Sequence, residues 1–479
     1  MNDQRESLPV YCNDRLVGDL HRKTSFASSG IKQTYDFMYE QDVPEDHFAS
    51  LLMPTARKEY LDILNVPHAF QTSIPEGWVR ERLAEQFGKA VSIKDDFSLL
   101  RLVGKNPIGR VTFGGTRSLR TLDQELLDRI LPTGHSAWAE ALFAQIGPEN
   151  LGASGAMPKL VMRDNGTLLF QDFLLKLETS NRFGIALAEE FALRVSRSAG
   201  IPTVDATRNA TGEALLIKRF DIDKDGATRL GFEDSCSLNG FSATFKYDGC
   251  IEKVFGMIES FVTEEFINQD KESLLKIVLL NDILRNGDAH LKNFGLVYRT
   301  AEDVRLTPSY DVLDTTLFIP GDFPALTLFQ HFPDEAAQHK KWFDKDALFD
   351  LRDIADIDVG DIRVLYRNLQ EATMIEAQRF RKEIRADKHL DDERKRFCEY
   401  MLDTLEHRIR HEGPLPVATI WKSADLSTSS GKSVVSPPCD AHIDQLAQQL
   451  AKQFASTESP QTSHPGSTRS AIKGPSSPS

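Results

Sequence analysis

Residues 278–314 constrain the chain most, because an apolar segment ends there in a dense cluster of polar side chains. Valine, leucine and isoleucine dominate residues 278–284, and residues 286–293 are Asn-Gly-Asp-Ala-His-Leu-Lys-Asn. A strand-like apolar segment follows at 294–298, and Asp311 precedes another apolar stretch. A single buried Asp is usually a satisfied hydrogen-bond acceptor, but that interpretation weakens when several polar residues are compressed between apolar elements. We therefore expect the chemistry of the chain to centre on this loop.

The spacing within the loop favours phosphoryl transfer. Asp288 and Asn293 are five residues apart, as in the catalytic loop of protein kinases. Phosphoryl transfer needs an acceptor for the hydroxyl proton, ligands for Mg²⁺ and donors for phosphate. Asp288 can be the acceptor, Asn293 and Asp311 are hard oxygen ligands for Mg²⁺, and His290 and Lys292 can donate to phosphate or orient the loop. The alternative is a metal-dependent hydrolase using the two Asp residues and His290, but further His or Asp ligands do not stand out.

Length, charge and cysteine pattern limit the class of protein. A chain of 479 residues predicts two or three domains, and a hydrophobic fraction of 41% suffices for sizeable cores. A net charge of −14 argues against a large nucleic-acid footprint. The five scattered cysteines form no C-x-x-C pair, which excludes a simple zinc module and a disulfide framework. The polar first residues predict no signal peptide, and no stretch is apolar enough to cross a membrane, so we expect a soluble cytoplasmic protein.

Residues 8–115 predict a small α+β module without a cluster of catalytic residue types. Two strand-like segments within 9–20 flank an Asn-Asp-Arg turn, which is typical of a hairpin, and residues 35–39 alternate like a strand. Residues 78–87 have helical spacing. Residues 99–113 suggest two strands broken by a Gly- and Pro-containing turn.

Two features of residues 116–235 suggest phosphate binding. After a helical stretch at 120–146, small residues lead into a strand and let backbone N–H groups approach phosphate, while Lys159 adds a positive charge. An ordinary turn is the alternative. Lys176 lies in an apolar strand, and the helix that follows carries Glu189. Such a Lys–Glu pair clamps the phosphates of ATP in kinases, whereas a lysine reaching solvent from an edge strand is the alternative.

The remaining residues predict a hinge, a helical lobe and a tail. A strand at 214–221, a turn and a returning segment lead to Glu-Asp-Ser-Cys at 233–236, where a hinge between a β lobe and a helical lobe would lie. Helical periodicity recurs at four places, namely 251–284, 342–352, 361–381 and 391–409. Residues 413–479 are rich in Ser, Thr, Pro, Gly and Gln, which predicts a disordered tail. Within it, residues 440–454 have the pattern of a short helix, either docked or transient.

These motifs together resemble the HipA family of serine/threonine-protein kinases, the toxins of type II toxin–antitoxin systems. The resemblance covers most of the chain to about residue 410 and is carried by the D-x-H-x-K-N segment at 286–294, Leu-Thr-Pro-Ser-Tyr-Asp at 306–311, Ser-Gly-Ala-Met-Pro-Lys at 154–159, Leu-Leu-Lys-Leu at 174–177 and the strand and hinge at 217–221 and 233–236. It implies an α+β, two-lobed protein-kinase-like fold, with a β-rich N-terminal lobe, an extra N-terminal α+β module and an all-helical C-terminal lobe. The implied boundaries are 8–115 for the module, 116–235 and 236–412 for the lobes, and 413–479 for the tail.

The resemblance also implies a role for each site residue. Asp288 would accept the proton, assisted by His290 and Lys292, and Asn293 and Asp311 would hold Mg²⁺. ATP would be bound by the phosphate-loop residues Ser154, Gly155, Ala156, Met157, Pro158 and Lys159, by Lys176, by the hinge residues Glu233, Asp234 and Ser235, and by His290, Asn293, Tyr310 and Asp311. Glu189 falls at the position of the helix glutamate of the family.

The function implied is that of an ATP- and Mg²⁺-dependent serine/threonine protein kinase acting as a toxin. Its substrate would be a translation-related protein, for some members an aminoacyl-tRNA synthetase. Its partner would be a small DNA-binding antitoxin, through which DNA contact is mainly made. The resemblance also implies that a serine of the phosphate loop can be autophosphorylated. Because position 152 is Gly, Ser154 is the candidate for this modification. A catalytically inactive nucleotide-binding co-repressor and a small-molecule kinase on a related scaffold are the alternatives.

Overall fold

The computed structural model describes residues 4–27, 30–62, 65–74, 95–117, 161–164, 167–178, 182–330 and 341–411. All of them belong to one unit, residues 1–433. Four expectations concern segments outside the described residues, namely the helices at 78–87 and 120–146, the phosphate loop at 152–159 and the tail with its helix.

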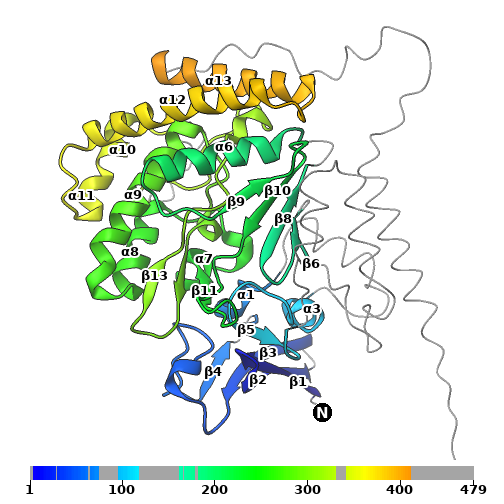
Figure 1. The fold of residues 1–479 in the computed structure, drawn as a ribbon. Helices are drawn as coiled ribbons and strands as arrows, with labels where there is room; N and C mark the ends of the chain where they lie inside the picture. Colours follow the sequence, from blue (N-terminus) through cyan, green and yellow to red (C-terminus); the bar gives the residue numbers. More distant parts are fainter. Residues whose placement is uncertain are drawn as a thin grey trace, which may run out of the picture. The chain divides into compact units, whose positions relative to one another are not determined.

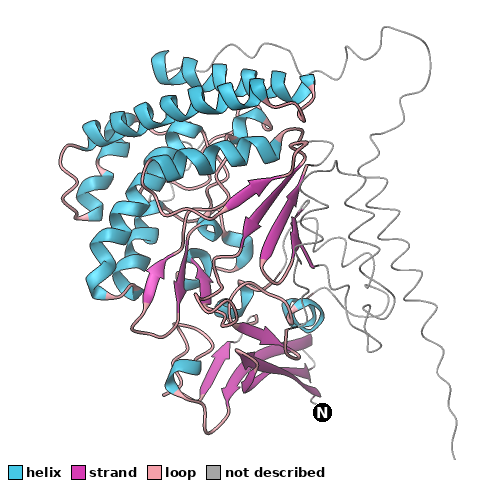
Figure 2. Ribbon diagram, in the orientation of Figure 1, coloured by secondary structure: helices cyan, strands magenta, loops and turns pink. Residues whose placement is uncertain are grey.

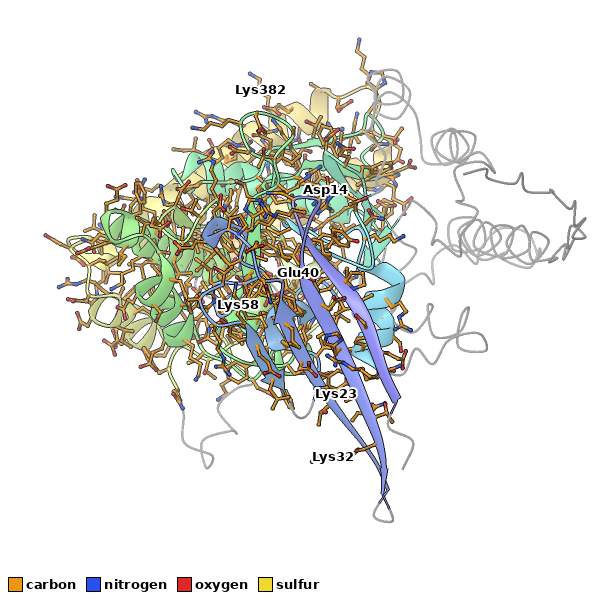
Figure 3. All side chains as sticks on the ribbon, turned by 90° about the horizontal axis from the view of Figure 1, so that it is seen from below. Asp14, Lys23, Lys32, Glu40, Lys58 and Lys382 are labelled. Carbon is orange, nitrogen blue, oxygen red and sulfur yellow. The ribbon has the colours of Figure 1, made fainter. Side chains whose placement is uncertain are left out.

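An antiparallel five-stranded sheet with the order β4-β3-β2-β1-β5 forms the N-terminal module (Figure 1). Its strands are β1 (Gln4–Cys12), β2 (Arg15–Ala27), β3 (Gly30–Tyr39), β4 (Glu59–Asp62) and β5 (Val111–Phe113). The predicted hairpin and the strand at 35–39 are both present, and the turn residues Asn13 and Asp14 have φ values of 46° and 62°, a region that Asn and Asp tolerate better than most residues. Figure 3 shows Lys23 and Lys32 on the β2–β3 hairpin, which extends away from the helices.

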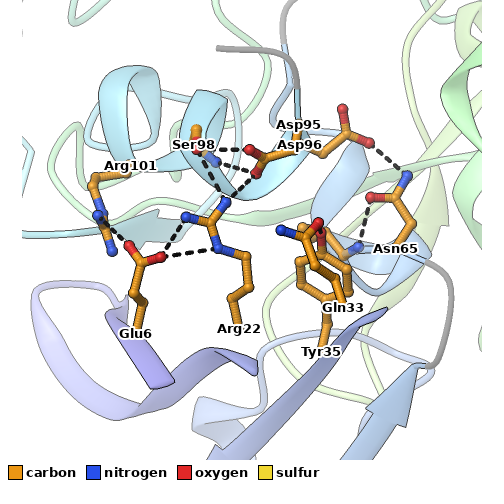
Figure 4. A network of polar contacts seen from close by, with 10 residues as sticks. Glu6, Arg22, Gln33, Tyr35, Asn65, Asp95, Asp96, Ser98 and Arg101 are labelled. Atoms are coloured by element: carbon orange, nitrogen blue, oxygen red, sulfur yellow. Dashed lines mark hydrogen bonds and ion pairs between the residues drawn. The ribbon is translucent and has the colours of Figure 1, made fainter. Parts of the chain in front are cut away.

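One of the two strands predicted at 99–113 is a helix. Residues 99–103 belong to α3 (Asp96–Val103), and only β5 forms. Asp95 caps α3 by accepting the N–H of Ser98 at 2.9 Å, and this cap favours the helix over the strand that the apolar residues suggested. Arg22 on β2 bonds to Asp95 at 2.8 Å and to Glu6 on β1, which ties the helix to the sheet (Figure 4).

A second antiparallel sheet, in the order β6-β7-β8-β10-β9, forms the strand-rich part of the kinase-like region. Its strands are β6 (Val161–Asp164), β7 (Thr167–Leu169), β8 (Phe173–Leu177), β9 (Ala206–Arg208) and β10 (Ala214–Lys218). The predicted helix, α6 (Ile185–Ser198), packs on β8 and β10 through Ala186 and Leu193. Strand β8, which carries Lys176, lies between β7 and β10. The alternative of a lysine on an edge strand is therefore wrong.

A third sheet corrects the expectation of an all-helical C-terminal lobe. It consists of β11 (Gly231–Asp234), β12 (Gly295–Tyr298) and β13 (Val304–Leu306). The turn at 223–226 forms and the chain returns beside it, with an antiparallel bridge between Ile222 and Arg229 and a hydrogen bond from the N–H of Leu230 to the carbonyl of Asp221. The next residues, 231–234, form β11 and pair with β12. The lobe expected to be all-helical thus contributes two strands, because Leu296 and Tyr298 alternate into the core while the chain reverses after the catalytic loop.

The other predicted helices are present, some with short interruptions. They are α8 (Ile251–Phe261), α9 (Ile267–Leu284), α10 (Lys345–Phe349), α11 (Leu351–Ala355), α12 (Ile362–Ala386) and α13 (Asp392–His411), with short α1 (His68–Gln71) and α7 (Ser235–Leu238) beside the sheets. Figure 2 shows these longer helices gathered away from the N-terminal sheet. Among the helices of the described ranges, none has both the length and the apolar character needed to cross a bilayer.

Candidate active site

The predicted catalytic loop, residues 286–293, begins where α9 ends. Arg285 has a left-handed backbone (φ 59°), and its N–H bonds to the carbonyls of Asn281 and Asp282, a common way to end a helix. Gly287 follows, and its N–H bonds to the Thr315 hydroxyl at 2.7 Å. A Cβ atom at 287 would lie only 2.2 Å from a carboxylate oxygen of Asp322. The sequence therefore needs glycine immediately before Asp288.

Asp288 is held by its backbone and by one side-chain contact. Its carbonyl accepts the N–H of His290 at 2.8 Å and the amide group of Asn293 at 3.0 Å. The Tyr247 hydroxyl donates to its Oδ1 at 3.1 Å. Burial raises the pKa of Asp288, and the charge of Asp311 raises it further, while the Tyr247 hydrogen bond opposes both effects. This carboxylate is thus a stronger proton acceptor than an exposed aspartate.

Lys176 joins three elements of the site. Its Nζ lies 2.8 and 2.9 Å from the two carboxylate oxygens of Glu189 on α6, and 2.5 Å from Oδ1 of Asp311. The Glu189 side chain is 1% exposed, whereas that of Asp311 is 39% exposed. Asp311 adopts φ 58°, an uncommon conformation that functional residues often have. The Lys–Glu pair expected from the sequence is present in the structure.

Asn293 and Asp311 form a donor set that fits Mg²⁺. The amide nitrogen of Asn293 is engaged by the carbonyl of Asp288, so its carbonyl oxygen is the atom suited to a cation. Among the described residues no group of three or more His, Cys, Asp and Glu side chains is arranged to hold a metal. Mg²⁺ needs no such group, because it binds through one or two protein oxygens and keeps several waters.

Lys292 and Tyr310 connect the loop to neighbouring elements. Lys292 Nζ pairs with Asp234 Oδ2 at 2.7 Å, and its carbonyl accepts the Tyr310 hydroxyl at 2.9 Å. The Tyr310 ring stacks on Phe220, with centroids 5.4 Å apart. These contacts link Lys292 to the hinge segment and Tyr310 to the backbone of the loop.

The three predicted hinge residues have different environments. The buried carboxylate of Glu233 accepts from the hydroxyls of Ser50 and Tyr298 and from the N–H of Leu51, at 2.6 to 2.7 Å. The Ser235 N–H donates to the carbonyl of Phe294 at 2.8 Å. N–H and C=O directions alternate along a strand. The N–H and C=O of Asp234 therefore point away from β12, toward the unpaired edge of β11.

The predicted phosphate-loop residues 154–159 lie outside the described residues. The sequence did not suggest Tyr247 or Thr315, whose contacts with the loop join residues 41 and 28 positions apart. No local pattern marks such partners, since only the tertiary fold brings them to the loop.

Comparisons with known proteins identify related sequences. Family models for the HipA N-terminal domain and the HipA-like C-terminal domain match residues 8–114 and 151–384. Two Sinorhizobium fredii proteins named as candidate kinases are similar: Y4dM is 26% identical over 294 residues, 57% of this chain and 68% of that protein. Y4mE is 27% identical over 139 residues, 27% of this chain and 32% of that protein.

A solved structure matches over a greater length. A chain of the Shewanella oneidensis toxin–antitoxin complex of HipA, HipB and operator DNA superposes with a TM-score of 0.55 at 18% identity, covering 84% of this chain and 96% of that chain. The predicted α+β, two-lobed kinase-like fold class is thereby confirmed. With both family models matched in order along the chain, this protein belongs to the HipA family.

Proposed function

We propose that the protein is an ATP- and Mg²⁺-dependent serine/threonine protein kinase. The observation that carries the proposal is the contact of Lys176 with both Glu189 and Asp311, which assembles a phosphate-binding lysine and a metal-binding aspartate around one point. The carboxylates of Glu189 and Asp311 both contact Lys176, and Asp288 lies close enough to Asp311 for the charge of Asp311 to raise its pKa. Such a surplus of negative charge favours a divalent cation.

In this proposal each residue has a distinct task. Asp288 accepts the proton of the acceptor hydroxyl, and Lys176 holds the phosphates of ATP. Asn293 and Asp311 hold Mg²⁺, which when bound neutralises the charge that develops on the phosphate oxygens. The backbone of Asp234 faces adenine, since the N–H of Ser235 is engaged by Phe294. Residues 154–159 complete the phosphate site.

We also propose that the kinase acts as the toxin of a toxin–antitoxin pair in the cytoplasm. The similar Shewanella oneidensis chain is part of a complex with HipB and operator DNA, which supports a small DNA-binding antitoxin as the partner here. The net charge of −14 favours DNA contact mainly through that partner. The proposed substrate is a translation-related protein, with aminoacyl-tRNA synthetases as first candidates, and Ser154 is the proposed autophosphorylation site.

The test is transfer of labelled phosphate from Mg-ATP to the protein itself and to proteins of a bacterial lysate. We expect transfer by the wild type and a loss of at least about a hundredfold in Asp288→Ala, since a general base contributes roughly 10²–10⁴ in rate. Lys382→Met is the control, because this lysine is exposed on α12 and is not one of the proposed site residues (Figure 3).

Three outcomes would contradict parts of the proposal. Nucleotide binding without any transfer would favour the inactive co-repressor. Transfer to small molecules alone would favour the small-molecule kinase. Phosphopeptide mapping that finds phosphate only within 413–479 would exclude Ser154 as the modified residue.

A further inference from the structure

We propose that residues 243–249, between α7 and α8, form the acceptor-side wall of the active site. In this wall Tyr247 positions Asp288, and Phe245 contacts the protein segment that carries the acceptor hydroxyl. The inference rests on the kinase function proposed above and adds the residues that present the acceptor.

The wall is fixed to the catalytic loop by its backbone. The N–H of Leu291 donates to the carbonyl of Lys246 at 3.1 Å. A Cβ atom at Gly249 would lie 2.6 Å from Cδ1 of Leu291, so the two segments touch closely there. The N–H of Ile251 bonds to the carbonyl of Thr327 at 2.9 Å and anchors the far end. The wall therefore has a defined position beside Asp288.

Tyr247 fixes the rotation of the Asp288 carboxylate. Its hydroxyl donates a hydrogen bond to Oδ1 of Asp288 at 3.1 Å. This leaves Oδ2 of Asp288 as the oxygen that can accept the proton of the acceptor hydroxyl. The Tyr247 ring packs edge-on against His290 at 5.2 Å between centroids, and Lys246 Nζ lies 5.1 Å from the ring centroid. These contacts hold the ring although 49% of Tyr247 is exposed. A base held in one orientation lowers the barrier, because less alignment remains to be made on the way to the transition state.

Phe245 gives the wall an exposed apolar side chain two residues before Tyr247. It is 52% exposed and belongs to the short 3-10 helix Ala243–Phe245 that leads into Lys246. A single exposed apolar side chain is ordinary, but here two exposed aromatic rings lie two residues apart on a segment bound to the catalytic loop. This surface fits an extended protein segment in which an apolar side chain neighbours the acceptor serine or threonine.

The experiment uses the full chain, Mg-ATP and pairs of serine peptides that differ only in an apolar residue or a glycine beside the serine. Tyr247→Phe keeps the ring and removes the donor, so kcat should fall about five- to tenfold for both peptides, as expected for one lost hydrogen bond of about 1 kcal/mol, with KM for ATP unchanged. Phe245→Ala should raise KM severalfold for the apolar peptide alone. Leu61→Ala, which alters a 59% exposed side chain on β4, should behave like the wild type.

Each other result overturns a defined claim. A wild-type kcat in Tyr247→Phe removes the positioning role, and equal losses on both peptides in Phe245→Ala remove the apolar contact. A wild type that phosphorylates itself but none of the peptides refutes the acceptor class while the kinase function stands. A wild type that transfers no phosphate to any acceptor refutes the proposed function and the wall together. Matching thermal melting curves identify variants that are folded.

Discussion

At the scale of single residues, the site depends on side chains that share one partner. Lys176 forms ion pairs with both Glu189 and Asp311. Its position is therefore set by α6 and by the segment after β13 together. A lysine in an interior strand is costly unless it is paired, and the two carboxylates supply that pairing. When nucleotide binds, Glu189 is the partner suited to hold the lysine, because its side chain is buried while that of Asp311 remains accessible to a cation.

Glu189→Gln tests this division of tasks. The amide keeps the shape but removes the charge that aligns Lys176, so we expect kcat/KM for ATP to fall about tenfold to a hundredfold, or about 1.4 to 3 kcal/mol of transition-state stabilisation. The global fold should persist, because Lys176 keeps Asp311 as a partner. Steady-state kinetics measure the effect, with the exposed Glu393→Gln on α13 as control. Unchanged kinetics would mean that Glu189 is not needed for alignment.

At the scale of elements, α6 is held in place by α12. Arg194 on α6 pairs with Glu376 at 2.7 Å and with Glu383 at 2.6 Å. Arg208 on β9 forms an ion pair with Glu190 of α6 at 2.9 Å. These ion pairs fix the helix that carries the site glutamate, so the Lys–Glu pair is built into the packing of the described residues.

Arg194→Ala should loosen that attachment. We expect a loss of about 1 to 2 kcal/mol in the free energy of unfolding, because Glu376 is buried and would be left without this partner while Glu383 is mostly exposed. Hydrogen exchange should accelerate in α6 more than in α9. Uniform acceleration across all helices would contradict a local role for the ion pairs.

The elements also show what sequence patterns can and cannot predict. Apolar segments and turn residues correctly located the β1–β2 hairpin, α6, α9 and α12, because the buried residues of each element recur in a local pattern. Residues 99–103 were predicted wrongly because the cap at Asp95 decides their conformation. The pairing of β11 with β12 joins residues about sixty positions apart, which no local signal encodes.

The same limit applies to the site. The spacing of polar residues selected Asp288, Asn293 and Asp311 as candidates, and the apolar strand around Lys176 selected that lysine. The environments of Glu233 and Lys292 were not predictable, because their partners Ser50 and Asp234 come from distant segments.

At the scale of the whole described unit, the N-terminal module supports the hinge strand. Ser50 of the module bonds to the buried Glu233 at 2.6 Å. The guanidinium of Arg110 donates to the carbonyl of Phe48 at 2.9 Å and lies 5.0 Å from the ring centroid of Tyr298. Loss of the donors Ser50 and Leu51 would leave the buried Glu233 carboxylate poorly satisfied and would be strongly destabilising. The module is therefore part of the structure that holds β11 and β12.

A second long-range connection involves one arginine and several acids. Arg394 of α13 bonds to Glu178 at 2.7 Å, pairs with Asp391 at 2.6 Å and lies 3.6 Å from Glu213. Glu178 follows β8 and also accepts the N–H of Gly184 at 2.8 Å, just before α6. Burial raises the pKa of Glu178 to about 7 despite the ion pair with Arg394, and the negative charges of Glu213 and Asp391 add to this rise.

The raised pKa of Glu178 predicts a pH dependence of stability. The pKa of Glu178 is 4.5 in the unfolded chain and about 7 in the folded protein, so the folded state binds more protons between these pH values. The stabilisation that Glu178 contributes is therefore full below pH 4.5 and is lost as the pH rises through 7. Chemical unfolding from pH 4.5 to 8 should show this loss, and Glu178→Gln should flatten the profile across that window. The control is Glu393→Gln, since Glu393 is exposed on the same helix as Arg394. An equally steep profile in Glu178→Gln would mean that other groups govern the window, and that Glu178 stays ionised beside Arg394.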